Sequence, residues 1–249
     1  MRSMFMRSFA AAMLAAMLSS SAEAIVFKEF TTGTEDLYIS DRTTSNDFEF
    51  NFNGDNLQAA VNSTSPGSVR RSLLHYDLSH FSGQGQFVIG KGTLNLYVEN
   101  GCPSCFKEAT MVAVLLTPND NEEWWGADYD FMVPNWTNYM DNFGGGEIGR
   151  QFMPGNLPRF TLVQIEIDGS AIQDWIDNPA DNWGMGLMLD DETIPSSDLE
   201  GKTFYSSSPP TGLDAFVPFL EIDLVIPEPA GLAILVGGGL MLGGRRKRV

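Results

Sequence analysis

Aromatic side chains gather in one stretch of the chain and are the residues best suited to contact a ligand. They are Trp124, Trp125, Tyr129, Trp136 and Tyr139. Exposed flat rings can bind sugar rings through apolar contacts, whereas buried rings fill a core. Because successive side chains of a strand point to opposite faces, Trp124 and Trp125 cannot both point inward from a strand. We therefore expect this stretch to contact a glycan, with packing in the core as the alternative.

Carboxylates in the same stretch have the chemistry to hold a hard cation. They are Asp120, Glu122, Glu123, Asp128 and Asp130. Calcium takes roughly six to eight oxygen ligands, but the spacing of an EF-hand loop is missing from the sequence. We expect a solvated acidic loop and no cofactor or metal site, with structural calcium as the alternative.

The two cysteines, Cys102 and Cys105, form a C-x-x-C motif in the segment Gly101-Cys-Pro-Ser-Cys. A four-thiolate zinc site needs a second pair of cysteines. A thioredoxin-like redox pair needs the start of a helix after a parallel strand, whereas this motif lies between two strand-like segments. In an oxidising compartment we expect a small local disulfide, with redox activity or free thiols as the alternatives.

The sequence contains no recognisable catalytic motif. Its two histidines are His75 and His80, and His75 falls in a strand-like segment where a packed or half-exposed structural role is expected. There is no G-x-S-x-G, H-E-x-x-H or P-loop pattern. With 32 acidic residues a glycosidase-type carboxylate pair stays open. We nevertheless expect a protein that is not an enzyme.

The N-terminus has the three parts of a secretory signal peptide. Arg2 and Arg7 precede the apolar run Phe9–Leu18, and Ala22-Glu23-Ala24 supplies a small-x-small cleavage site. We predict that residues 1–24 are removed by signal peptidase after Ala24. A membrane anchor is the alternative.

The C-terminus has the features of a second sorting signal. Pro227, Glu228 and Pro229 form a stiff spacer, and the 15 uncharged residues Ala230–Gly244 follow. As a helix these would span about 22 Å at about 1.5 Å per residue, slightly less than a hydrocarbon core. A basic stop completes the segment with Arg245, Arg246, Lys247 and Arg248. These cations should stay cytoplasmic, which places the body across the membrane.

The charge of the chain is strongly acidic, with a formal net charge of −17. The two terminal segments hold six of the 15 basic residues and only two of the 32 acidic ones, so trimming makes the body more acidic. Such a surface repels nucleic acid and favours cations. Solubility outside the cell is the simpler reason for the same charge.

Residues 25–226 form one predicted domain, because alternation of apolar and polar residues runs through it. The predicted strands are Leu37–Ser40, Phe48–Phe52, Arg71–Leu78, Leu94–Val98, Ala109–Leu116, Thr161–Ile167, Met185–Leu189, Thr203–Ser206 and Phe219–Leu224. Short strands without long helices between them favour an all-β antiparallel β-sandwich or jelly roll.

One short helix and one long irregular stretch complete the prediction. Ser170 is expected to cap a helix that ends near Pro179 and buries Trp175. Trp183, at the entry to a strand, is also expected in the core. The stretch Thr117–Pro158 is rich in glycine and proline and is predicted to be irregular; loops of that length are often functional.

The C-terminal segment 227–249 closely resembles the PEP-CTERM sorting signal of Gram-negative bacteria. The matching parts are the Pro227-Glu228-Pro229 spacer, the apolar run and the basic stop, in that order and at the extreme end of the chain. The resemblance implies an inner-membrane intermediate processed by an exosortase. It also implies a bacterium that makes extracellular polysaccharide.

The body resembles the DNRLRE-type domain, a β-sandwich of exported proteins, some of which are classed as carbohydrate-binding modules. The segments that carry the resemblance are Asp36–Ser40, Arg71–Leu78, Gly92–Val98, Asn121–Trp124, Asn135–Thr137, Ala171–Trp175, Asn182–Leu187 and Phe204–Ser207. The Cys102–Cys105 motif and the glycines around Gly144 depart from that pattern.

Together these observations predict an exported protein of the cell surface or extracellular matrix that associates with polysaccharide without catalysis. Two other functions stay open. One is a purely structural matrix or adhesin protein with protein partners. The other is a carbohydrate-active enzyme.

Overall fold

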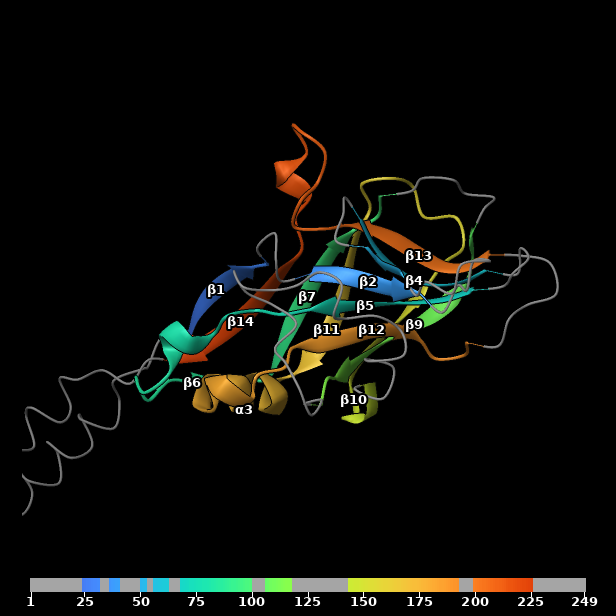
Figure 1. The fold of residues 1–249 in the computed structure, drawn as a ribbon. Coiled ribbons are helices and arrows are strands. Elements are labelled where there is room, and N and C mark those ends of the chain that lie inside the picture. The colour runs from blue at the N-terminus through green and yellow to red at the C-terminus, as the bar shows by residue number, and fades with distance from the viewer. Residues whose placement is uncertain are drawn as a thin grey trace, which may run out of the picture.

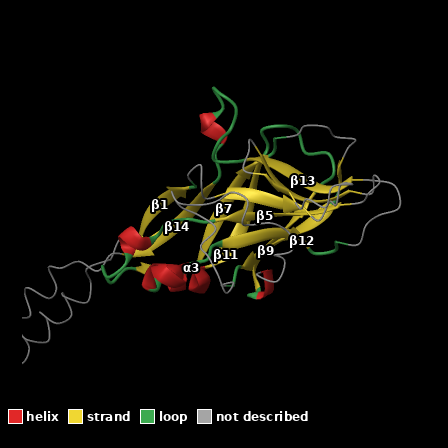
Figure 2. Ribbon diagram, viewed as in Figure 1, coloured by secondary structure: helices red, strands yellow, loops and turns green. Residues whose placement is uncertain are grey.

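The computed structural model describes residues 24–31, 36–40, 50–52, 56–62, 68–99, 106–117, 143–192 and 199–225 (Figure 1). Strands dominate this part of the chain, and short helical segments lie between them (Figure 2). Neighbouring strands pair antiparallel, apart from one short parallel pair between β13 (Leu199–Tyr205) and β8 (Phe106–Lys107). The prediction of a mostly antiparallel β body is therefore confirmed.

The first sheet contains five strands in the order β1-β14-β7-β11, with β6 added beside β14. Their bounds are β1 Ala24–Phe30, β14 Phe219–Val225, β7 Lys91–Tyr97, β11 Leu162–Asp168 and β6 Phe87–Val88. β11 alternates strictly between exposed and buried residues, which is the pattern of a strand with one face in the core and one in solvent.

The second sheet runs in the order β10-β9-β12-β5-β4-β13-β8, and β2 pairs with both β5 and β3. The bounds of its remaining strands are β10 Glu147–Met153, β9 Ala109–Leu115, β12 Met185–Leu189, β5 Ser68–Leu74, β4 Asn56–Asn62, β2 Asp36–Ser40 and β3 Phe50–Phe52. In β9 the run Met111–Val114 is buried at every position, because this sheet is covered on both faces.

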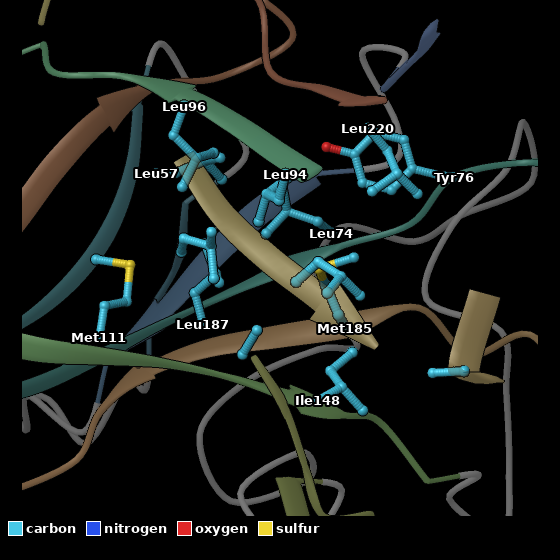
Figure 3. Packing of buried hydrophobic residues seen from close by; sticks show 14 of the residues in the cluster. Leu57, Leu74, Tyr76, Leu94, Leu96, Met111, Ile148, Met185, Leu187 and Leu220 are labelled. Carbon is cyan, nitrogen blue, oxygen red and sulfur yellow. The ribbon is translucent and has the colours of Figure 1, made fainter. Parts of the chain in front are cut away.

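One hydrophobic core joins the inner faces of the two sheets. It takes Leu94, Leu96 and Leu220 from the first sheet and Met111, Met185 and Leu187 from the second (Figure 3). A smaller cluster on the other face of the second sheet contains Leu37, Ile39, Leu73, Val112, Val114, Leu116 and Phe143. The two layers therefore enclose a common apolar interior, as expected for a domain built from packed sheets.

The sheets also approach each other at one edge, where β10 lies beside β11. A side chain at Gly149 of β10 would overlap the carbonyl oxygen of Glu166 in β11. Only glycine leaves the room for that approach. The second sheet therefore curls toward the first on this side.

The helix α3 (Gly169–Asp177) packs its apolar face into the core through Ala171, Ile172, Trp175 and Ile176. The predicted helix is confirmed, and so is the burial of Trp175, which is 4% exposed. The prediction that Ser170 caps the helix was wrong. The cap is Asp168, whose side chain accepts a hydrogen bond from the Ser170 N–H at 2.9 Å. Asp168 ends β11, so the strand supplies the cap directly.

Other strand predictions need correction. Sequence patterning missed β1, β4 and β10, and β10 falls inside the stretch predicted to be irregular. β5 ends at Leu74, so His75 follows the strand instead of lying in it, although it is buried as expected. Trp183 is half-buried and packs against the smaller cluster. The alternation of β10 is weak because four of its seven residues are exposed and a fifth is glycine, which hides the signal of a strand.

Among the described residues, no helix is both long enough and apolar enough to cross a membrane. The C-terminal segment 227–249, which is predicted to enter the membrane, lies outside that part of the chain, as do residues 1–23 of the predicted signal peptide.

Candidate functional site

A tight turn at Pro158–Thr161 holds an aromatic residue in an unusual backbone conformation. The Thr161 N–H donates to the Pro158 carbonyl at 3.2 Å, and Phe160 has a φ of 67°. Turns with this geometry at their third residue normally use glycine. A bulky residue there costs about 1–2 kcal/mol of backbone strain. Two hydrogen bonds with Val98 hold the turn. The Phe160 N–H donates to the Val98 carbonyl at 2.8 Å, and the Val98 N–H donates to the Thr161 carbonyl at 3.0 Å.

The Phe160 ring is the exposed member of a group of four rings from four segments. Its centroid lies 4.5 Å from that of Phe216 and 5.9 Å from that of Tyr205, to which it is nearly parallel. Phe216 also contacts Tyr97 edge-on at 5.2 Å. Phe160 is 41% exposed, whereas Tyr205 is fully buried. The group therefore has a buried base and a solvent-facing top.

Arg159 completes the group. Its Nε donates to the Tyr205 hydroxyl at 2.7 Å. Its guanidinium carbon lies 4.8 Å from the Phe160 centroid and 5.6 Å from the Tyr205 centroid, which are cation–π distances. These contacts fix an exposed cation beside an exposed ring. We call Tyr97, Arg159, Phe160, Tyr205 and Phe216 the aromatic platform.

A buried lysine anchors the loop that leads into the platform. Lys202 is 1% exposed, and its Nζ donates to the carbonyls of Lys107 at 3.2 Å and Gly155 at 3.4 Å. Burial lowers the pKa of Lys202 from 10.5 to about 8, because the charged ammonium loses its hydration. Lys202 thus ties β13 to β8 and to the residues just before the turn.

The platform has the chemistry of a binding surface. An exposed ring face offers apolar contact to a flat ligand face, and the neighbouring guanidinium offers hydrogen-bond donors. This combination suits a sugar ring, including one that bears a carboxylate. Its five side chains include no carboxylate, thiol or imidazole, so the platform itself carries no general acid, base or nucleophile.

A separate cavity of about 400 Å³ lies beside α3. Its lining comprises Leu115, Leu116, Thr117, Gly145, Ala171, Asp174, Trp175, Asn178 and Asp181. The cavity therefore has an apolar side with two carboxylates and one amide at its polar side. A pair of carboxylates in one cavity is the arrangement in which glycosidase chemistry would be sought.

A charged groove of about 420 Å³ crosses the meeting edge of the two sheets. There the Lys91 ammonium donates to Glu166 at 2.6 Å, which raises the pKa of Lys91. Arg150 pairs with Glu147, whose pKa is lowered by that hydrogen bond, and lies 3.5 Å from Asp190. These charges satisfy one another, so the groove behaves as a salt-bridged surface. In the part of the chain that is described, no cluster of three metal-ligating His, Cys, Asp or Glu side chains occurs.

The sequence-predicted site residues fall almost entirely outside the described part of the chain. This holds for Trp124, Trp125, Tyr129, Trp136 and Tyr139, for the acidic residues beside them, and for Cys102 and Cys105. It also holds for Ala22, the Pro227-Glu228-Pro229 motif and the basic residues 245–248. Ala24, the predicted cleavage residue, is the first residue of β1.

Local sequence patterns do not indicate the platform, because its members are far apart along the chain. Tyr97 and Tyr205 end two different strands, and Phe216 lies in the 3-10 helix η4 (Asp214–Phe216). The one local signal was Pro158-Arg-Phe-Thr161, a turn-like segment in which the turn's third residue is aromatic.

Comparison with known proteins assigns no family to the chain. No protein-family model matches the sequence, and no curated protein matches it.

Proposed function

We propose that this chain is an exported protein of the cell surface or extracellular matrix that associates with polysaccharide without catalysis. In this proposal signal peptidase cleaves after Ala24 and an exosortase removes the tail at Pro227-Glu228-Pro229, after a transient stay in the inner membrane. The order and spacing of the two terminal signals support the export route. The producing organism would be a Gram-negative bacterium that secretes polysaccharide.

For the body, we propose a sandwich or jelly roll of the DNRLRE type. Two sheets that share one core support this assignment, as does the order of the resembling segments along the chain. We also propose that Cys102 and Cys105 are disulfide-linked after export, because both follow a signal for an oxidising compartment.

The observation that carries the binding proposal is the exposed ring of Phe160. The turn holds a ring that is 41% exposed at a backbone position that favours glycine, and strained positions of this kind cluster at binding sites. Sugar binding is the role we propose for it, because a ring face and a fixed guanidinium together match the apolar face and hydroxyl groups of a pyranose.

The test is retention of the exported, processed protein on the polysaccharide of the producing bacterium. Phe160→Ala should reduce retention at least several-fold while circular dichroism stays unchanged. Phe152→Ala is the matched control, since Phe152 is 53% exposed but lies on β10, which contributes no residue to the platform. Equal retention of wild type and Phe160→Ala would remove the platform from the proposal.

Further variants separate the remaining functions. If Trp124→Ala, Trp125→Ala or Trp136→Ala abolishes retention while Phe160→Ala does not, the sequence-predicted aromatic stretch is the contact. Release of reducing ends that is lost in Asp174→Asn or Asp181→Asn would indicate an enzyme acting at the cavity beside α3. Binding to matrix proteins but to no glycan would favour the structural or adhesin role.

A further inference from the structure

The two ends of the described chain lie side by side in one sheet. β1 and β14 pair antiparallel over their whole lengths, so Ala24 lies opposite Val225 (Figure 1). On the other side of β14, Val225 lies opposite Phe87 of β6. Strands paired in this way are about 4.8 Å apart. The segments that precede Ala24 and follow Val225 therefore leave the body from neighbouring points.

An apolar patch surrounds these points on the outer face of the first sheet. Residues directly opposite each other in antiparallel strands point to the same face. One row across the three strands is Ala24, Val225 and Phe87, and the next contains Val26 and Ile89 on either side of Asp223. Val26, Phe87 and Ile89 are 55%, 57% and 44% exposed. We call Ala24, Val26, Phe87, Ile89 and Val225 the terminal patch.

A charged row borders the terminal patch on that outer face, which farther away also exposes Phe30 and Leu162. The following row contains Lys28 and Glu221, which form an ion pair at 3.6 Å. β11, at the far side of the same sheet, exposes Gln164, Glu166 and Asp168. Clustered exposed apolar residues with a polar border mark an interaction surface.

The sequence on either side of the patch indicates what this surface contacts. Only residues 226–229 separate Val225 from the uncharged run Ala230–Gly244, and four extended residues span at most about 14 Å. On the other side, five residues, 19–23, separate Ala24 from the apolar run Phe9–Leu18. Both linkers are short and leave the body at neighbouring points. They therefore hold the terminal patch close to any bilayer into which the two apolar runs insert.

We propose that the terminal patch rests on the lipid bilayer while the precursor is tethered, with Val26, Phe87 and Ile89 in the interfacial layer. This inference rests on the proposed export route. The half-buried Asp223 between Val26 and Ile89 limits the contact to the headgroup region, because a carboxylate is costly deeper in the membrane. Seated in this way, the body presents both processing points at the membrane surface and directs the opposite end of the sheets into the periplasm.

The experiment uses the full chain reconstituted into phosphatidylethanolamine–phosphatidylglycerol vesicles. A Cys102→Ser, Cys105→Ser background leaves a single reactive thiol in each variant, placed by Phe87→Cys or by the control Phe152→Cys. Both positions are exposed phenylalanines of similar accessibility, in β6 of the first sheet and in β10 of the second. A polarity-sensitive fluorophore is attached to each thiol, and quenching by nitroxide-labelled lipid is measured.

The expected result is blue-shifted emission and several-fold stronger lipid quenching at position 87 than at position 152. Equal, water-like emission at both positions in a vesicle-inserted chain overturns the patch while leaving the export proposal intact. A chain that alkaline carbonate strips from the vesicles overturns the proposed membrane tether, and the patch contact with it. A blue shift at position 87 that lipid nitroxide does not quench, and that grows with protein density, identifies a second copy as the occupant and also overturns the proposal.

The same contact can be tested without cysteine labelling. In the native sequence, Phe87→Ser with Ile89→Ser should increase protease access to the Ala24–Phe30 strand in vesicles several-fold over wild type, and Phe152→Ser should leave it unchanged. No difference between the double variant and wild type would contradict the membrane contact.

Discussion

Replacing Phe160 by glycine and by alanine separates the cost of its backbone from the value of its ring. Both changes remove the ring, but only glycine relieves the strain of a φ of 67°. A non-glycine residue in this region costs about 1–2 kcal/mol. Relief of this strain by glycine is partly offset, by about 0.4–1 kcal/mol, because glycine makes the unfolded chain more flexible.

The net expectation is that Phe160→Gly is more stable than Phe160→Ala by about 0.5–1 kcal/mol. Burial of a whole phenylalanine side chain contributes about 1.5–3 kcal/mol, and Phe160, at 41% exposed, realises roughly half of that. Its ring contact with Phe216 adds about 0.5–1.5 kcal/mol. Phe160→Ala should therefore lower the free energy of unfolding by roughly 2 kcal/mol, and Phe160→Gly should lower it by less.

The assay is urea unfolding of the exported protein, monitored by fluorescence, with polysaccharide retention measured on the same samples. Phe152 supplies a control of opposite sign: it lies in the regular strand β10, so Phe152→Gly should be less stable than Phe152→Ala by about 0.5–1 kcal/mol. If glycine is the less stable replacement at both positions, Phe160 is not held in a strained turn. The argument that its exposure reflects a function then fails.

Three other outcomes are expected. The free energy of unfolding of the wild type should rise between about pH 8 and pH 10.5, because there the unfolded chain keeps a proton that the buried Lys202 amine has lost. The pKa shift corresponds to roughly 3 kcal/mol, and Lys202→Met should remove this rise. Urea-unfolding free energies of wild type and variant that run parallel over this pH range would contradict the expectation. Asp168→Ala should cost about 1 kcal/mol at neutral pH through loss of the α3 cap. Because hydrogen bonds from Ser170 lower the pKa of Asp168, that difference should vanish as the pH falls below the ordinary value of 3.8, and a pH-independent difference would exclude the cap as its cause. Intact-mass measurement of the exported protein should find neither residues 1–24 nor Arg245–Arg248, and a mature species that retains the basic stop would refute exosortase processing.

Local patterns in the sequence were enough to predict the fold class and several elements. Met185–Leu189 was predicted with its observed bounds, because a short apolar run between a glycine and acidic residues is a property of the segment itself. The helix at α3 was predicted from its apolar spacing, although the cap lies two residues earlier, at the end of β11. β10 and β4 were missed: what makes them strands is their pairing with β9 and with β5 and β13.

The proposal of two terminal signals rests on the sequence alone, since a processing enzyme reads such segments as linear peptides. Only the tertiary structure decided that the ends of the body meet, because the register of β1 and β14 brings together Ala24 and Val225, which are 201 positions apart. The same holds for the aromatic platform, in which a strained turn, two strand ends and a 3-10 helix contribute one residue or two each. Neither arrangement has a linear signature, because both depend on which strands pair and on how the two sheets enclose one core.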